Sequence, residues 1–389
     1  MSGEIVVTGL GVISPIGIGV SEFWKAALDG RSGISAIAAF DPFPMDGYRS
    51  KVAGQIHGFS PERYLDSIQA ERVDRYAQFA LVAAKEALAD SGLQMAKENP
   101  RRIGVIVGAG MGGMVMGERE ITQLYQSQRP HRVHPNFIPV ITLNSASGIV
   151  AMAHGAKGPN YTISTACSSS AHALGQAMQC IKEGRADVVV TVGADASITP
   201  LVFAGFCSLR ALSTKYNDQP ERASRPFDRQ RDGFVMGEGA GALVLESSAH
   251  ARKRRARIYA EVAGYAATSE AYHMVIPRED GEEIAATMRL AMDVAALEPV
   301  RIPSSIPPFV RLADDLRKPI PFGSQLPNQL IAQLRMLLDQ GPFFLRQTTG
   351  LCDDRRRNGE ESDVVDQAGK RQSFQFLAVV AQTRADFCR

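Results

Sequence analysis

The chain of 389 residues is short of the patterns from which metal centres and disulfide frameworks are built. It has five cysteines, none paired with another at metal-ligand spacing, and they are too few and scattered for a disulfide framework. Its seven histidines form neither an HExxH motif nor a cluster with cysteines. We therefore expect no metal, and reduced thiols in a cytoplasmic protein.

The sequence also lacks a large excess of charge and any long apolar segment. Its net charge is +2, from 43 Lys and Arg against 41 Asp and Glu, so the total implies no field for binding nucleic acid. The densest basic run, residues 252–255, has no interleaved aromatic residue and is typical of a solvated helix end or a surface for an acidic partner. No apolar run approaches the roughly 20 residues that span a bilayer, and the N-terminus shows no signal-peptide pattern. We expect a soluble protein that binds neither nucleic acid nor membrane.

Short apolar strands alternate with helical patterns through the first 300 residues. The strands are apolar on both faces, which is typical of a layered α/β domain with a mostly parallel sheet covered by helices on both sides. The expected strands are residues 4–12, 102–107, 188–192, 240–246 and 258–265, and the expected helices are 21–28 with Ser21 as N-cap, 74–91 ending at Gly92, 143–154 and 281–296.

One segment combines a strand, a cysteine and the start of a helix. Residues 161–172 read YTISTACSSSAH, so a short β-prone run ends near Cys167, and a helix-favouring stretch follows three serines. A cysteine in such a position lies beside unpaired N–H groups and the positive end of the helix dipole, which favour a thiolate. Cys167 is therefore the predicted nucleophile and acyl acceptor, and its N–H could form half of an oxyanion hole. His172 should not face the sulfur, because it lies about a turn and a half further along the helix.

A glycine motif follows the strand at 102–107. Gly108, Gly110 and Gly113 satisfy the dinucleotide fingerprint GxGxxG, but no Asp or Glu occurs from residue 121 to residue 182 to bind a ribose. We favour tight turns with close backbone approach over nucleotide binding. A nucleotide-binding oxidoreductase remains an alternative.

The composition changes after about residue 300. Residues 301–389 have no histidine, five glycines, and eleven arginines against two lysines. A helix is expected at 328–338 and a strand at 374–380. Composition leaves open whether this tail is a divergent domain or an out-of-frame segment.

Several long motifs, in order, carry a resemblance to a known family. The chain resembles the β-ketoacyl-[acyl carrier protein] synthases of the elongating type II kind, in the thiolase superfamily, over about residues 3–299. The motifs are VVTGLG at 6–11, TACSSS at 165–170, RALS at 210–213, RPFD at 225–228 and AYHM at 271–274. Arg255 stands where many relatives have a turn glycine.

The resemblance implies a five-layered αβαβα thiolase-like fold, a homodimer and a ping-pong reaction without a cofactor. In that reaction acyl carrier protein delivers an acyl group to Cys167, malonyl carrier protein is decarboxylated, and the carbanion attacks the thioester. Met111 would gate the acyl pocket, and Phe137 and Phe206 would line it. Residues 1–255 would form the N-terminal domain with the nucleophile, and residues 256–299 the start of the C-terminal domain.

The tail departs from the family. The family's two catalytic histidines, in HGT and GH motifs, and the family's GFGG loop belong after about residue 300. This sequence has no histidine beyond His273. The abrupt end of the resemblance favours a frameshifted or misassembled tail at 300–389, so that the C-terminal half is truncated or replaced. We expect a chain that acylates Cys167 but fails in condensation. The alternative is a non-catalytic subunit that binds carrier protein or a dimer partner.

Overall fold

The computed structural model describes residues 3–37, 40, 43–66, 70, 73–273 and 275–297, and the backbone of strand 377–382. Most of the described strands join one eight-stranded sheet in the order β11-β10-β1-β9-β7-β5-β6, with β2 paired to β1. These strands are β1 (Ile5–Ser14), β2 (Gly17–Ile18), β5 (Ile103–Gly108), β6 (Asn160–Ile163), β7 (Val188–Asp195), β9 (Gly239–Ser247), β10 (Ala260–Ala267) and β11 (Leu377–Gln382). A smaller sheet contains β3 (Ser35–Ala36), β4 (Val52–Gly54) and β8 (Met236–Gly237).

The large sheet is mixed. Strand β5 is parallel to β6 and β7, whereas β9 is antiparallel to β7 and β1, and β10 is antiparallel to β1 and β11. The expectation of a mostly parallel sheet is therefore wrong. Strands that are apolar on both faces indicate that both sides are covered, but they do not fix strand direction. The chain leaves β7, crosses the long segment 196–238 and enters β9 in the opposite direction.

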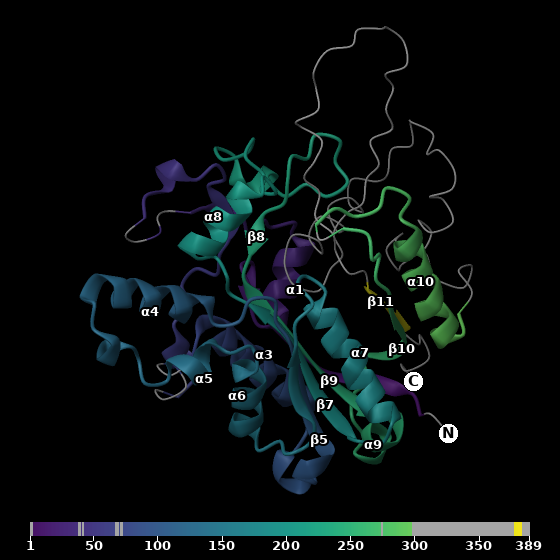
Figure 1. Ribbon diagram of the computed structural model, residues 1–389. Helices are drawn as coiled ribbons and strands as arrows, with labels where there is room; N and C mark the ends of the chain where they lie inside the picture. The colour runs from purple at the N-terminus through teal and green to yellow at the C-terminus, as the bar shows by residue number, and fades with distance from the viewer. Residues whose placement is uncertain are drawn as a thin grey trace, which may run out of the picture.

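Helices lie on both faces of this sheet (Figure 1). Val105 and Val107 face the cluster that contains α3 and α6, and Ile106 between them faces the cluster of α7, as the alternation of side chains in a strand requires. The helices are α1 (Val20–Leu28), α3 (Arg75–Ser91), α4 (Met114–Ser127), α5 (Phe137–Ile141), α6 (Ser145–His154), α7 (Ser169–Lys182), α8 (Pro200–Ser208), α9 (Ser248–Lys253) and α10 (Glu282–Ala295).

The ends of α3 follow from local signals. The carboxylate of Asp74 at the N-cap accepts a hydrogen bond from the Tyr76 N–H at 3.3 Å, and Gly92 ends the helix with a left-handed φ of 63°. The predicted helix at 74–91 is thus confirmed.

The start of α1 differs from the prediction. Ser21 lies inside the helix, and Gly19 is the N-cap. Glu86, on the neighbouring α3, accepts a hydrogen bond from the Val20 N–H at 2.7 Å. A carboxylate distant in sequence therefore caps this helix in place of a local serine.

The other strands and helices expected before residue 297 are present with shifted ends, but α4, α5, α8 and α9 were not predicted. In α4 the buried residues are Met116 and Glu120, so the helix carries no broad apolar stripe for the sequence to show. The helix expected at 328–338 lies outside the described residues. The strand expected at 374–380 overlaps β11. None of the helices described here is long and apolar enough to cross a membrane.

Candidate active site

Cys167 lies at a sharp elbow between β6 and α7. Strand β6 ends at Ile163, α7 begins at Ser169 with Ser168 as N-cap, and Cys167 directly precedes that cap with an exposed side chain. Ala166 has a left-handed φ of 53°, which is rare for a residue with a Cβ and costs about 1 kcal/mol. The predicted arrangement of strand, cysteine and helix is confirmed.

The serines that follow Cys167 hold the elbow together. The Ser168 hydroxyl donates to the Thr165 carbonyl at 2.7 Å, and the Ser169 hydroxyl donates to the Ala166 carbonyl at 2.7 Å. The Ser169 oxygen also accepts from the Thr165 N–H at 2.9 Å. These bonds tie the backbone on both sides of Cys167 and offset the strain at Ala166.

His172 supports the same elbow. Its Nδ1 lies 2.9 Å from the Thr165 hydroxyl and 3.2 Å from the Ser168 carbonyl oxygen. Its ring meets Tyr265 edge-on, with 6.4 Å between ring centroids. The hydrogen-bonding of this nitrogen is directed to the elbow backbone and the threonine.

Two glycines let the first turn of α7 approach the sheet. A Cβ on Gly108 would stand 2.3 Å from the Ser169 carbonyl oxygen, and a Cβ on Gly193 would stand 2.1 Å from the Ser170 hydroxyl oxygen. Gly113, the last glycine of the GxGxxG run, packs against α5, where a Cβ would lie 2.6 Å from the Ile141 Cα. The predicted close backbone approach is confirmed.

The loop that carries Met111 lies beside the elbow. The Ser164 hydroxyl donates to the Gly110 carbonyl at 3.3 Å, and Met111 itself is 43% exposed. Asp195, at the end of β7, accepts hydrogen bonds from the Gly110 N–H at 2.7 Å and the Met111 N–H at 3.2 Å. Burial raises the pKa of Asp195, although these hydrogen bonds and one from Ser197 act to lower it.

Phe137 and Phe206 lie on helices that contact this loop region. Phe137 begins α5, against which Gly113 packs. Phe206 is half-buried in α8 and meets Phe234 edge-on, with 5.4 Å between ring centroids. Their roles as pocket walls, like that of Met111 as a gate, stay predictions.

Sequence reasoning missed two carboxylates in this region. Asp195 holds the Met111 loop, and Glu118 of α4 accepts hydrogen bonds from the Leu201 N–H at 2.9 Å and from the Thr199 hydroxyl at the N-terminus of α8. An acidic residue at the carboxyl end of a buried strand was the available signal for Asp195. Glu118 gave none, because its partners are some 80 positions away in sequence.

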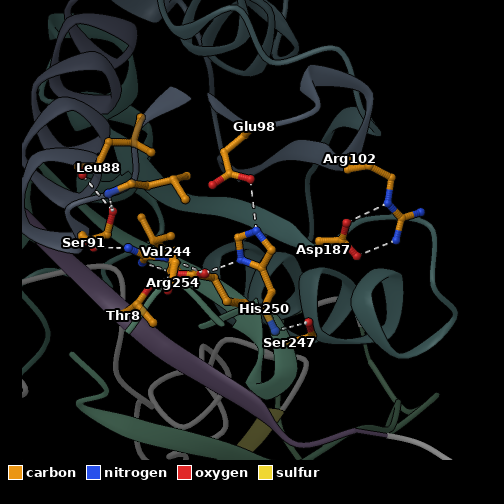
Figure 2. Close-up of polar contacts among 12 residues, drawn as sticks. Thr8, Leu88, Ser91, Glu98, Arg102, Asp187, Val244, Ser247, His250 and Arg254 are labelled. Atoms are coloured by element: carbon orange, nitrogen blue, oxygen red, sulfur yellow. Dashed lines mark hydrogen bonds and ion pairs between the residues drawn. The ribbon is translucent and has the colours of Figure 1, made fainter. Parts of the chain in front are cut away.

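A second polar network lies at the opposite end of the sheet (Figure 2). Fully buried Glu246 accepts hydrogen bonds from the Thr8 hydroxyl and from Arg254, whose Nε is 2.9 Å away. His250 places Nδ1 2.6 Å from Glu246 and Nε2 3.1 Å from Glu98. Ionised carboxylates only accept, so these two contacts favour the protonated imidazole, in which both ring nitrogens donate.

The pKa values in this network follow from the same contacts. Burial acts to lower the pKa of His250, but the hydrogen bonds to Glu246 and Glu98 outweigh it and raise that pKa. Burial acts to raise the pKa of Glu246, and its hydrogen bonds, chiefly from Arg254, bring it below the ordinary value. The basic run at 252–255 lies at the end of α9, so the predicted helix end is confirmed, but Arg254 is largely buried in this network and not solvated.

Among the residues that the structure describes, no group of His, Cys, Asp and Glu has the arrangement of a metal site. Cys180 and Cys207 are free and buried. Of the cysteines in the described ranges, Cys167 is the one with an exposed sulfur-bearing side chain.

Comparison with known proteins identifies the family and the fold. The family model for the N-terminal domain of beta-ketoacyl synthases matches residues 2–251, and the chain belongs to this family of condensing enzymes. Two similar curated proteins are the 3-oxoacyl-[acyl-carrier-protein] synthase 2 of Vibrio cholerae, 44% identical over 289 residues (74% of this chain and 69% of the relative), and that of Staphylococcus aureus, 44% identical over 296 residues (76% and 70%).

Solved structures show the same thiolase-like fold. A ketosynthase in complex with its type II PKS acyl-carrier protein matches with a TM-score of 0.70 and 34% identity, covering 77% of this chain and 72% of that one. A beta-ketoacyl synthase from Burkholderia phymatum has a TM-score of 0.70 and 30% identity over the same shares. The family and fold predicted from the motifs are therefore confirmed.

Proposed function

We propose that this chain is a 3-oxoacyl-[acyl-carrier-protein] synthase of fatty acid biosynthesis and that Cys167 accepts the acyl group. The observation that carries the proposal is the exposed Cys167 at a strained elbow immediately before the N-terminus of α7. The helix dipole there favours the thiolate and the negative charge that develops during acyl transfer.

The loading step follows from this geometry. The Cys167 thiolate attacks the thioester carbonyl of an acyl carrier protein, and the tetrahedral intermediate collapses to release the carrier thiol. In the second half-reaction malonyl carrier protein loses carbon dioxide, and its carbanion attacks the acyl-Cys167 carbonyl. This attack forms the new carbon–carbon bond and releases the Cys167 sulfur, and the product is a 3-oxoacyl carrier protein two carbons longer.

We further propose that this chain performs only the loading step and fails in condensation. Stabilising the carbanion needs hydrogen-bond donors at the malonyl thioester, which are histidines in the family. The sequence has no histidine beyond His273, and His172 is directed to the elbow. We accordingly propose that residues 1–255 form the N-terminal domain and residues 256–299 the start of the C-terminal domain. Residues 300–389 would then be a frameshifted or misassembled replacement for the rest of the C-terminal domain.

The test separates the two half-reactions. Acyl carrier protein loaded with a medium-length acyl chain is incubated with the protein, and acylation of Cys167 is followed by mass spectrometry, with Cys167→Ser as the blank. Malonyl carrier protein is then added, and 3-oxoacyl product is measured. We expect acylation and no product. Absence of acylation would refute the enzymatic role, and a malonyl-dependent product would refute the proposed defect.

The second candidate is a carrier-protein-binding or dimer-partner subunit without catalysis. Exposed apolar side chains on α4, α5 and α6 favour a protein partner: Tyr125 is 71% exposed, Ile138 64% and Met152 82%.

We also propose that the chain forms a homodimer that buries Tyr125, Ile138 and Met152. Sedimentation of the wild type and of a Tyr125→Lys, Met152→Lys variant measures it, and a wild type that sediments as a monomer at micromolar concentration would contradict it.

We also propose a cytoplasmic location. Cys180 and Cys207 are free thiols inside the fold, which is the usual state of cysteine in a reducing compartment. Fractionation of the source cells with an antibody against the chain would test it, and recovery outside the cytoplasmic fraction would contradict it.

A further inference from the structure

Asp195 joins the strand that ends beside the elbow to the loop that carries Met111. Its Oδ2 accepts the Gly110 N–H at 2.7 Å, and its Oδ1 accepts the Met111 N–H and the Ser197 hydroxyl, each at 3.2 Å. Three donors therefore converge on one carboxylate, and two of them are backbone groups of the loop. Backbone N–H groups can only donate, so the two carboxyl oxygens of Asp195 accept both bonds and fix the loop at two successive residues.

The loop fixed in this way contacts the nucleophile's own backbone. A Cβ on Gly110 would lie 3.1 Å from Asp195 Oδ2 and 3.7 Å from the Ala166 carbonyl oxygen, so the loop lies between the carboxylate and the elbow. The Ser164 hydroxyl adds a bond to the Gly110 carbonyl from the other side. A shift of the loop therefore changes the space beside Cys167.

The segment after Asp195 is fixed from the loop side as well. Glu118, on the helix that follows the Met111 loop, caps α8 through the Leu201 N–H at 2.9 Å and the Val202 N–H at 3.3 Å. Helix α8 carries Phe206. Asp195, which precedes α8, thus binds the Met111 loop, and Glu118, which follows that loop, binds the N-terminus of α8.

We propose that Asp195 is a positioning residue that sets which acyl chains reach Cys167, because it holds the loop that carries Met111, the predicted gate of the acyl pocket. The inference rests on the proposed function for the identity of the acyl substrate. It assigns Asp195 no contact with the acyl group. Asparagine keeps only one side-chain oxygen, so the Gly110 or the Met111 N–H group loses its acceptor, and Met111 then gates less strictly.

The experiment measures access to Cys167 without a carrier protein. Wild type and Asp195→Asn are treated with N-ethylmaleimide and with a maleimide that bears a long straight alkyl chain. Fragment mass spectrometry locates the modification at Cys167 and measures its rate with each reagent. We expect the long-to-short rate ratio to rise by about tenfold in Asp195→Asn, the factor that corresponds to the loss of one hydrogen bond. The N-ethylmaleimide rate should stay within about twofold of wild type, since the elbow itself keeps its serine bonds.

Asp187→Asn is the matched control. Asp187 precedes the same strand at its other end, where it accepts hydrogen bonds from Arg102 at 2.6 and 2.9 Å. This variant should lose stability and keep the wild-type ratio. Ser197→Ala, which removes a single donor from Asp195, should raise the ratio less than Asp195→Asn and replaces that variant if it fails to fold.

The outcomes are distinct. An unchanged ratio in folded Asp195→Asn, or in Ser197→Ala where Asp195→Asn does not fold, would overturn the inference. An equal rise in Asp187→Asn would overturn it too, because the effect would then be one of general stability. Failure of acyl transfer from carrier protein, with the ratio shifted as expected, would refute the proposed function and leave the positioning role of Asp195 standing.

Discussion

Replacing Gly108 with alanine should displace the first turn of α7 and slow acyl transfer to Cys167. The added Cβ would stand 2.3 Å from the Ser169 carbonyl oxygen, 2.4 Å from its carbon and 2.5 Å from the Ser170 nitrogen. These are backbone atoms, so no side chain can rotate away. Because non-bonded heavy atoms prefer separations of about 3.5 Å, the helix and the strand must separate by about 1 Å.

The size of the effect follows from that displacement. Forcing a methyl group into a packed contact of this kind costs about 1–3 kcal/mol of unfolding free energy. Cys167 is bonded through Ser168 to the displaced Ser169, so its sulfur moves by a comparable distance. A misplacement of about 1 Å in a reacting group lowers the rate by about 100-fold.

Gly148→Ala is the matched control. Gly148 lies inside α6, and a Cβ there would meet nothing within 4 Å. Alanine in a helix interior is favoured over glycine by about 0.5–1 kcal/mol, so this variant should be as stable as wild type or more so and should acylate normally. Urea denaturation measures stability, and mass spectrometry measures the acylation rate of Cys167. Wild-type stability and rate in Gly108→Ala would refute the packing argument.

Three further predictions concern stability. The pKa of His250 is raised in the folded state, so this residue stabilises the fold fully below its unfolded pKa of about 6.5, and the contribution is lost as pH rises through the folded pKa. In urea denaturation His250→Gln should therefore lower the free energy of unfolding by about 2 kcal/mol near pH 6 and by less at pH 9. A cost independent of pH would contradict the hydrogen bond to Glu98. Glu118→Gln should lower the free energy of unfolding by about 1 kcal/mol because a neutral amide caps α8 more weakly, and equal stability would count against the cap. Gly175→Ala should cost about 1–3 kcal/mol in urea denaturation, since its Cβ would stand 2.0 Å from the Tyr265 ring, and the same change made in a Tyr265→Ala chain should cost less.

Features with local causes could be predicted from the sequence. The ends of α3 depend on Asp74 and Gly92, which act within one or two residues of their own positions. Arg255, which stands where many relatives have a turn glycine, has a left-handed φ of 56°. The elbow at Cys167 was equally visible, because its strand, cysteine and helix are contiguous in the chain.

Features with distant causes could not. The direction of β9 depends on the path of residues 196–238, and the cap of α1 comes from Glu86 on another helix. Asp195 and Glu118 accept hydrogen bonds from backbone N–H groups 83 to 85 positions away. Hydrophobic periodicity reports which face of an element is buried, and it carries no record of which polar group a folded backbone will meet.

The distinction between loading and condensation rests on what each step requires. Loading needs a nucleophile, charge stabilisation at its thioester and room for an acyl chain. The structure places the exposed Cys167 at the N-terminus of α7, and the Met111 loop is the proposed boundary of the acyl chain. Condensation also needs donors at a second thioester. In the described part of the chain, His172 is directed to the elbow, and burial lowers the pKa of His154, whose buried Nε2 meets no hydrogen-bond partner there. A malonyl-dependent product from this polypeptide would mean that groups other than histidine stabilise the carbanion, so the two-step assay tests the chemistry of the tail directly.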